Sequence, residues 1–285
     1  MVAFVILHYQ TIEETEKCVE SVLAMSHISE IRVVIVDNAS PNGTGKELQE
    51  RWDDNEYVHV ILNAENVGFS KGNNIGCMYA RETWNPDFYV VANNDVIFTQ
   101  NDFVQRIEKE YEKSEFYVLG PDIFDITNHV HQSPIGKCAP SKNRVIETII
   151  LNTVALKTFF ISKGLLKKYY SNKDKVSDVC DYDIYQEDVL LMGACLIFSE
   201  KYIEERAVDT GTIKAFYPET KFYYEEAIMY HWCESNGKKI VYSPDIRVEH
   251  INGGATKTNR DESARIRSQM NNICDAAKIY LTELR

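Results

Sequence analysis

IRVVIVDNAS, at residues 31–40, decides the fold class together with the similar segment VAFVILHYQ at residues 2–10. Each segment is a short apolar run, rich in β-branched residues, that ends in polar side chains. A run of this kind predicts a strand buried on both faces of a sheet, and favours a strand over a signal peptide for residues 1–10. Apolar residues at helical spacing follow both runs, which is the alternation expected of an α/β fold.

The same alternation continues through the first half of the chain. Strands are predicted at residues 2–8, 31–37, 58–62 and 88–92, and helices at residues 12–25, 44–52, 70–84 and 102–113. Thr11 and Glu14 have the spacing of a capping box before the first helix. The pattern predicts an α/β fold with a mostly parallel central sheet flanked by helices. Ligands of such sheets bind beyond the carboxyl ends of the strands.

The second half of the chain is less regular. We expect turns around residues 120–143, a short strand at 194–198, a helix at 224–236, a strand pair near 240–250 and an amphipathic helix from about residue 262. No repeat or low-complexity linker separates the two halves. The prediction is therefore one domain over residues 1–260, followed by a C-terminal helix at 261–285.

Composition restricts the class of protein. The 285 residues include 31 Lys and Arg against 43 Asp and Glu, a net charge of −12, and 44% are hydrophobic. Such a chain can form a large core, and its acidic field argues against nucleic acid as a partner. Seven scattered cysteines without a CxxC pair indicate reduced thiols. No apolar run approaches the roughly 20 residues of a spanning helix, so we expect a cytoplasmic protein.

Polar side chains follow the predicted strands of the first half. The candidate site residues in these polar segments are His8 and Tyr9, Asp37 and Asn38, Asn66, Gly68, Phe69, Asn73 and Asn74, and Asn93, Asn94 and Asp95. Asp95 suits a hard divalent cation, and Asp37 suits the imide N–H of a pyrimidine base. The turn before residue 70 opens a helix whose N-terminus favours an anion. Each group also fits an ordinary turn, with Asp37 capping residues 38–42.

Two further groups lie in the second half. Glu225 and Glu226 follow a run of aromatic residues at the start of a predicted helix. Burial there would raise a carboxylate pKa and suit a general base, whereas both acids could instead complement the helix dipole. His250 ends the last strand, where it could ligate a metal, donate to a phosphate or serve the structure alone.

In this order, these residues resemble the family 2 glycosyltransferases with the GT-A fold, which build bacterial capsule and cell-wall polysaccharides and include rhamnosyltransferases. The resemblance covers about residues 2–256. It implies that Asp37 contacts the base of a UDP- or dTDP-sugar and that residues 66–74 lie near the ribose and diphosphate. Asp95 then corresponds to the surviving acid of a DxD-like motif, which reads Asn93-Asn94-Asp95 here, and it would hold Mn²⁺ or Mg²⁺ with His250.

The resemblance also implies an inverting reaction. The family's usual Glu-Asp pair reads Glu225-Glu226 here. Glu226 corresponds to the base that deprotonates a hydroxyl of a glycan or lipid-linked saccharide, and Glu225 is its neighbour. Gly193 and Ala194 would lie near the sugar pocket, where small side chains leave room, or simply form a buried strand. Residues 1–115 would be the nucleotide-sugar-binding half and residues 116–260 the acceptor and catalytic half.

Residues 156–170 combine four lysines with aromatic and aliphatic side chains. Such a stretch could lie on an anionic membrane at the inner face of the cell, or pack on the core with solvated lysines. Two other functions stay open, a catalytically silent nucleotide-sugar-binding module and a sugar nucleotidyltransferase. The latter would need a glycine-rich basic loop after the first strand, which residues 8–11 lack. The oligomeric state is open.

Overall fold

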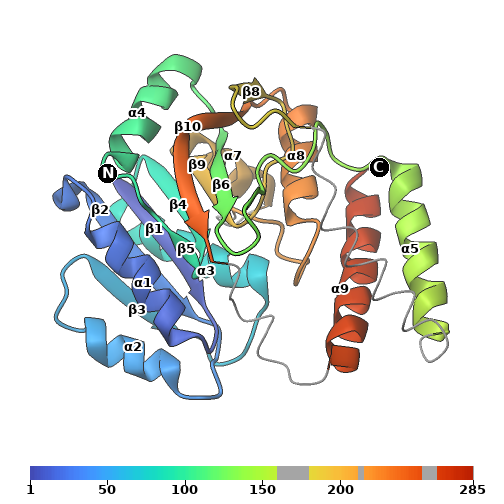
Figure 1. Cartoon of the computed structure of the whole chain (residues 1–285), viewed down its shortest axis with the longest axis horizontal. Helices are drawn as coiled ribbons and strands as arrows, with labels where there is room; N and C mark the ends of the chain where they lie inside the picture. The colour runs from blue at the N-terminus through green and yellow to red at the C-terminus, as the bar shows by residue number, and fades with distance from the viewer. Residues whose placement is uncertain (159–179, 211–214, 252–261, 285) are drawn as a thin grey trace.

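The computed structural model describes residues 1–158, 180–210, 215–251 and 262–284. Within these residues ten strands form one mixed sheet, in the order β3-β2-β1-β4-β9-β6-β10-β5, with β7 paired to β6 and β8 to β10 (Figure 1). The strands are β1 (Val2–His8), β2 (Ile31–Asp37), β3 (Val58–Leu62), β4 (Phe88–Asn93), β5 (Val96–Ile97), β6 (Val118–Asp125), β7 (Val130–His131), β8 (Gln186–Glu187), β9 (Cys195–Ser199) and β10 (Ile240–His250).

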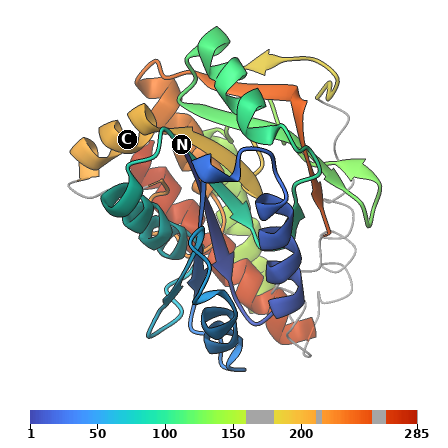
Figure 2. The same cartoon turned by 90° about the vertical axis from the view of Figure 1, so that its left-hand side faces the viewer.

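Helices cover both faces of the sheet. They are α1 (Ile12–Leu23), α2 (Thr44–Trp52), α3 (Phe69–Trp84), α4 (Phe103–Ser114), α5 (Lys142–Lys157), α7 (Glu200–Thr210), α8 (Glu225–Ser235) and α9 (Glu262–Glu283). Phe4 and Ile6 pack with α1, α2 and α4 on one face, whereas Val5 packs with α3, α7 and α8 on the other. Figure 2 shows α1 and α3 on opposite sides of β1. This two-sided burial explains the continuous apolar runs of the first half.

The predicted α/β fold with a mostly parallel sheet is confirmed. Strands β3, β2, β1 and β4 are parallel neighbours, as are β6 and β10. The antiparallel strands are β9, which lies between β4 and β6, and the two-residue strands β5, β7 and β8. Helix α3 lies close to the sheet because a Cβ at Gly76 would overlap the side chain of Val5.

Three local predictions were wrong. Residues 240–250 form the single strand β10, whose pairing with β6 shifts register between Ser243 and Arg247, where Pro244 cannot donate a ladder hydrogen bond. Residues 120 and 121, expected in a turn, lie inside β6 beside this irregularity. Thr11 precedes α1 without a capping hydrogen bond from its side chain, because its hydroxyl accepts a hydrogen bond from Asn94.

The C-terminal helix α9 begins where the sequence predicts it. It packs side by side with α5, and both lie beyond α8 (Figure 1). Tyr280 on α9 is buried against α8, and its ring lies 5.4 Å from that of Tyr224. Helix α9 therefore covers apolar surface of the second half. No helix in the described ranges has both the length and the apolar character needed to cross a bilayer.

Candidate functional site

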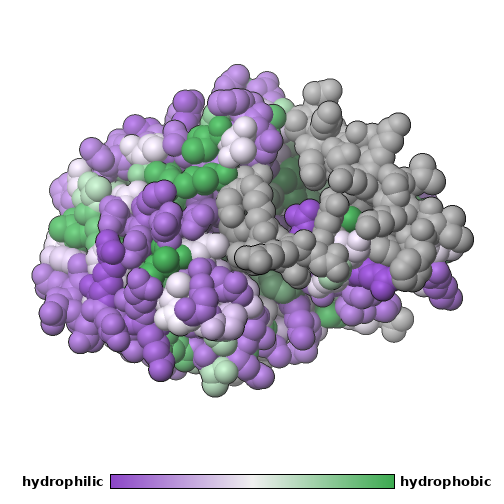
Figure 3. All heavy atoms as spheres, turned by 60° about the horizontal axis from the view of Figure 1, so that its bottom comes forward, coloured by the Kyte–Doolittle hydropathy of each residue, from purple (hydrophilic) through white to green (hydrophobic). Residues whose placement is uncertain are grey.

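The carboxyl ends of β1, β2 and β4 meet at one edge of the sheet. His8 is paired with Asp37 in the ladder between β1 and β2, and Leu7 with Asn93 between β1 and β4. Figure 3 turns toward the viewer the side to which β1 and β10 run, and its coloured surface is mostly hydrophilic with small separate hydrophobic areas. The residues predicted at three strand ends therefore lie at one polar edge.

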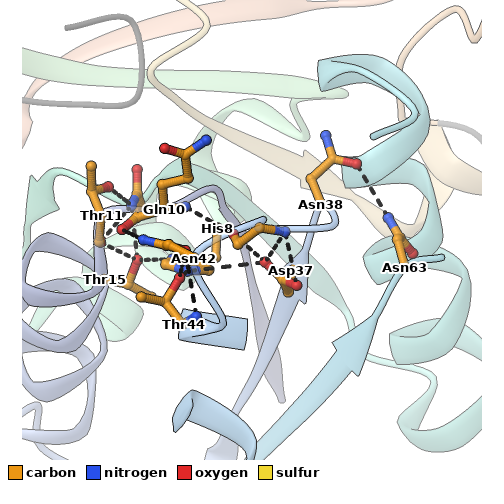
Figure 4. Close-up of polar contacts among 11 residues, drawn as sticks. His8, Gln10, Thr11, Thr15, Asp37, Asn38, Asn42, Thr44 and Asn63 are labelled. Atoms are coloured by element: carbon orange, nitrogen blue, oxygen red, sulfur yellow. Dashed lines mark hydrogen bonds and ion pairs between the residues drawn. The ribbon is translucent and has the colours of Figure 1, made fainter. Parts of the chain in front are cut away.

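His8 lies beneath this edge. Its ring is fully buried, with Nδ1 2.7 Å from Thr15 Oγ1 and Nε2 2.9 Å from Thr44 Oγ1 (Figure 4). Burial lowers the pKa of His8 to about 4, although the charge of Asp37 acts in the opposite direction. The ring thus connects β1 to α1 and α2, and it does not face a ligand as the sequence led us to expect. Tyr9 is partly exposed.

Asp37 is buried at the end of β2 and holds the turn after it. Its Oδ1 accepts hydrogen bonds from the amide of Ser40 at 3.2 Å and from the Ser40 hydroxyl at 2.5 Å. Its Oδ2 occupies the space that a Cβ at Gly45 would need. The first turn of α2 therefore approaches the carboxylate closely, where the helix N-terminus favours negative charge. The turn-capping alternative for Asp37 is present in the structure.

Asn38 joins the strand end of β2 to the loop before α3. Its Oδ1 accepts a hydrogen bond from the amide of Val67 at 3.0 Å, and its Nδ2 donates to Asn66 Oδ1 at 3.1 Å and to the carbonyl of Gly68 at 3.2 Å. Figure 4 shows Asn63 reaching the same side chain. Gly68 has φ +86°, which favours glycine, and a Cβ there would lie 3.0 Å from the Lys221 backbone.

The start of α3 is held against residues 215–221. The Phe69 amide donates to the Lys221 carbonyl at 2.8 Å, and the hydroxyls of Ser70 and Thr220 are 2.9 Å apart. Asn74 donates to the Phe216 carbonyl at 2.8 Å and accepts from the Phe216 amide at 2.9 Å. The Asn74 side chain is therefore buried in a loop contact, where the sequence predicted contact with the ligand. Sequence reasoning assigned no role to Phe216.

Asn73 also lies inside the protein. Its side chain is fully buried and donates to the carbonyl of Phe69 at 3.1 Å. Asn94 is buried as well, and its amide donates at 2.8 Å to the hydroxyls of both Thr11 and Thr15. These two amides support the backbone at the edge of the site through their NH₂ groups.

Asp95 and His250 lie together, although 155 positions separate them. Strand β5 pairs antiparallel with β10, which places Val96 opposite His250. Asp95 Oδ1 is 3.0 Å from His250 Nε2, and both side chains are buried. No group of three or more His, Cys, Asp or Glu side chains with metal-binding geometry occurs in the described part of the chain. A carboxylate with an imidazole fits a divalent ion that also takes water or phosphate oxygens.

Glu225 and Glu226 begin α8. Glu226 Oε1 accepts a hydrogen bond from the Gly193 amide at 3.2 Å, and a Cβ at Gly193 would lie 2.5 Å from the same oxygen. Burial raises the pKa of both carboxyls, and the pKa of Glu225 reaches about 8 because the charge of Glu226 adds to the effect. Glu225 Oε1 is buried with no hydrogen-bond partner in the described structure. The two acids therefore have different surroundings.

Gly193 and Ala194 connect the acid pair to the edge of the sheet. The amide of Asn93 donates to the carbonyl of Ala194 at 2.8 Å, and the amide of the preceding Gly193 donates to Glu226. Ala194 is 1% exposed but lies in the turn just before β9, so it is buried as the alternative expected without belonging to the strand. Two hydrogen bonds, one at Gly193 and one at Ala194, therefore link Glu226 to the strand end that precedes Asp95.

Comparison with known proteins identifies the family. The model of glycosyl transferase family 2 matches residues 3–168, more than half of the 285 residues. The chain belongs to this family, and its fold is that of the GT-A glycosyltransferases.

One curated relative is the low-salt glycan biosynthesis hexosyltransferase Agl10 of Haloferax volcanii. It is 22% identical over 223 residues, which make up 78% of this chain and 60% of the relative. The chain therefore spans less than two thirds of the length of that protein.

Two solved structures share the fold. S. aureus TarS 1-349 in complex with UDP has a TM-score of 0.55 and 13% identity, over 95% of this chain and 70% of the other. GalNAc-T7 with UDP, GalNAc and Mn²⁺ has a TM-score of 0.57 and 12% identity, over 90% of this chain and 45% of the other. At these identities the likeness shows the fold alone.

Proposed function

We propose that this chain is an inverting glycosyltransferase that moves a sugar from a UDP- or dTDP-sugar to a hydroxyl of a glycan or lipid-linked saccharide. The observation that carries the proposal is the hydrogen-bonded connection from Asn93 through residues 193 and 194 to Glu226. It joins a candidate base to the edge where a nucleotide would bind. The relative Agl10 is named a hexosyltransferase, and the two solved structures contain UDP, which supports the same class of reaction.

Donor binding is assigned to the first half, residues 1–115. Asp37 accepts a hydrogen bond from the base, Tyr9 offers a partly exposed ring beside it, and the backbone of residues 66–70 faces the ribose and diphosphate. Asn38, Asn73 and Asn94 support this backbone from below. Asp95 and His250 would hold Mn²⁺ or Mg²⁺, and the ion would neutralise charge on the departing diphosphate.

Proton removal is assigned to Glu226 in the second half, residues 116–260. Two buried carboxyls side by side do not both ionise readily, so the pair shares one negative charge near neutral pH. The Gly193 amide donates to Glu226 and favours its charged form, whereas Glu225, with a pKa of about 8, keeps its proton. Glu226 then accepts the proton of the acceptor hydroxyl, whose oxygen attacks the anomeric carbon opposite the nucleotide.

The test is transfer by the isolated protein. UDP- and dTDP-sugars are supplied with saccharide acceptors and with Mn²⁺, Mg²⁺ or a chelator, and release of the nucleoside diphosphate is measured. We expect one donor to support metal-dependent turnover that Glu226→Gln lowers by orders of magnitude, with donor binding retained. Donor binding without turnover in every condition would favour the catalytically silent module. Pyrophosphate release from a nucleoside triphosphate would favour the nucleotidyltransferase.

We also propose a peripheral location at the inner face of the cell membrane. The sequence predicts membrane contact for residues 156–170, of which residues 159–170 lie outside the described residues. Support comes from α5, which exposes 37% to 59% of four apolar side chains at helical spacing. These are Ile146, Ile150, Leu151 and Val154. Lys142, Arg144 and Lys157 on the same helix carry positive charge in a chain of net charge −12. This combination is typical of a helix on an anionic lipid surface.

Vesicle flotation tests this location. The wild-type chain should float with phosphatidylglycerol vesicles, and a double variant, Ile150→Asp with Val154→Asp, should stay at the bottom of the gradient. Met78→Asp is the matched control because Met78 on α3 is 39% exposed and lies outside α5. Equal flotation of the wild type and the double variant would contradict the proposal.

A further inference from the structure

A chain of side-chain hydrogen bonds runs from Asp95 through His250 and Gln132 to Asp125. His250 Nε2 lies 3.0 Å from Asp95 Oδ1, and His250 Nδ1 lies 2.7 Å from Gln132 Oε1. Gln132 Nε2 donates to Asp125 Oδ2 at 3.0 Å. Asp95, His250 and Asp125 are all buried. Gln132, just after β7, belongs to no motif of the sequence analysis.

Asp125 determines which way the Gln132 amide faces. Its Oδ1 accepts hydrogen bonds from the amides of Thr127 and Asn128 at 2.8 and 2.9 Å, and its Oδ2 accepts from Asn128 Nδ2 at 2.8 Å. A carboxylate in these contacts acts only as an acceptor. Reversing the Gln132 amide would place its oxygen 3.0 Å from a carboxylate oxygen. The NH₂ group therefore faces Asp125, and Oε1 faces His250.

The amide in turn determines the tautomer of His250. Because Gln132 Oε1 can only accept, the proton of the neutral ring must be on Nδ1. Nε2 then presents its lone pair beside Asp95 Oδ1, 3.0 Å away. Two acceptors at this distance attract a cation. Adjacent ligands of an octahedral ion with bonds of about 2.1 Å are separated by about 3.0 Å, so the pair matches the spacing of such an ion.

We propose that Gln132, oriented by Asp125, is a positioning residue that keeps His250 in the Nδ1–H tautomer, so that Nε2 and Asp95 bind one divalent cation together. The cation step rests on the proposed function, whereas the tautomer can be observed in the metal-free protein. Outer partners of metal-bound histidines commonly change metal affinity by about 10- to 100-fold when they are removed.

The test compares Gln132→Met with Gln100→Met. Methionine keeps the length of glutamine and removes the acceptor. Gln100 is the matched control because it also contacts β10, accepting from the Arg247 amide at 2.9 Å and donating to the Asp245 carbonyl at 3.0 Å, without a contact to His250. Gln132→Asn, one methylene shorter, replaces the methionine variant if that variant unfolds.

Two measurements give the result. Imidazole nitrogen chemical shifts from NMR of the metal-free protein should show an Nδ1–H ring for His250 in the wild type and in Gln100→Met, and a mixture of tautomers in Gln132→Met. The Kd for Mn²⁺ alone, measured by electron paramagnetic resonance, should rise at least about tenfold in Gln132→Met only. A merely structural role would not change the tautomer in a folded variant.

Several outcomes would overturn the inference. An Nε2–H ring in the wild type would refute the assigned orientation of the amide. Equal Mn²⁺ affinity in the wild type and Gln132→Met would refute the positioning role while leaving the proposed function intact. An Nδ1–H ring in a wild-type protein that does not bind Mn²⁺ would refute the cation step of both proposals.

Discussion

Replacing Gly193 by alanine should slow sugar transfer by moving Glu226. The new Cβ would lie 2.5 Å from Glu226 Oε1, whereas ordinary van der Waals contact begins at 3.4 Å, so the carboxylate must shift by about 0.9 Å (3.4 − 2.5). A displacement of about 1 Å in a catalytic group can cost about 100-fold in rate. We therefore expect kcat to fall by about two orders of magnitude. Stability should change little, because the displaced atom ends a flexible side chain.

The assay measures kcat, KM for the donor and the midpoint of thermal unfolding. Gly136→Ala is the matched control, since the nearest atom to its new Cβ would be the Cys138 carbonyl oxygen at 3.8 Å. The control should keep its activity, and both variants should bind the donor as the wild type does. A folded Gly193→Ala protein with wild-type kcat would refute the assignment of Glu226 as the base.

Three further predictions concern stability. Gly68→Ala should lower the free energy of unfolding by about 1–3 kcal/mol in urea titrations, because φ is +86° and its Cβ would meet Lys221; an unchanged midpoint would contradict this. The pKa of His8 is about 4 in the folded chain against 6.5 normally, so the unfolded chain binds more protons between these values and stability falls as pH drops through this window. His8→Gln should remove about 3 kcal/mol of that dependence between pH 7 and 4, and parallel stability curves would contradict the burial argument. The pKa of Glu225 is about 8 in the folded chain and 4.5 normally, so the folded chain binds more protons between these values and the stability of the wild type declines from pH 4.5 to 8. Thermal unfolding at several pH values should show a smaller decline for Glu225→Gln. An equal decline in the wild type and the variant would contradict the raised pKa.

The sequence predicted the parallel half of the fold because β1, β2 and β4 are buried on both faces. Apolar runs such as residues 31–37 leave little choice of secondary structure, and their ends identify the polar edge. The second half was harder to predict because its pairings are long-range. Strand β9 inserts between β4 and β6, and nothing in the local spacing indicates its antiparallel direction.

The residue types at the candidate site could be predicted, but their contacts could not. His8 follows the same pattern as Asp37 at a strand end, yet two threonine hydroxyls satisfy its ring inside the protein. Asn74 likewise looks like a ligand-binding amide in the sequence and instead pairs with the backbone of Phe216. Gln132 lies among irregular turns without periodicity, so only the structure reveals its contact with His250.

The most direct test of the proposed site is calorimetric binding of UDP and dTDP, with and without Mn²⁺, to the wild type, Asp95→Ala and Glu226→Gln. We predict that one nucleotide binds the wild type with Mn²⁺ dependence, that Asp95→Ala loses this dependence, and that Glu226→Gln keeps it while failing to transfer sugar. Nucleotide binding that does not depend on Mn²⁺, or whose Mn²⁺ dependence is unchanged in Asp95→Ala, would contradict the assignment of the diphosphate and cation to this edge of the sheet.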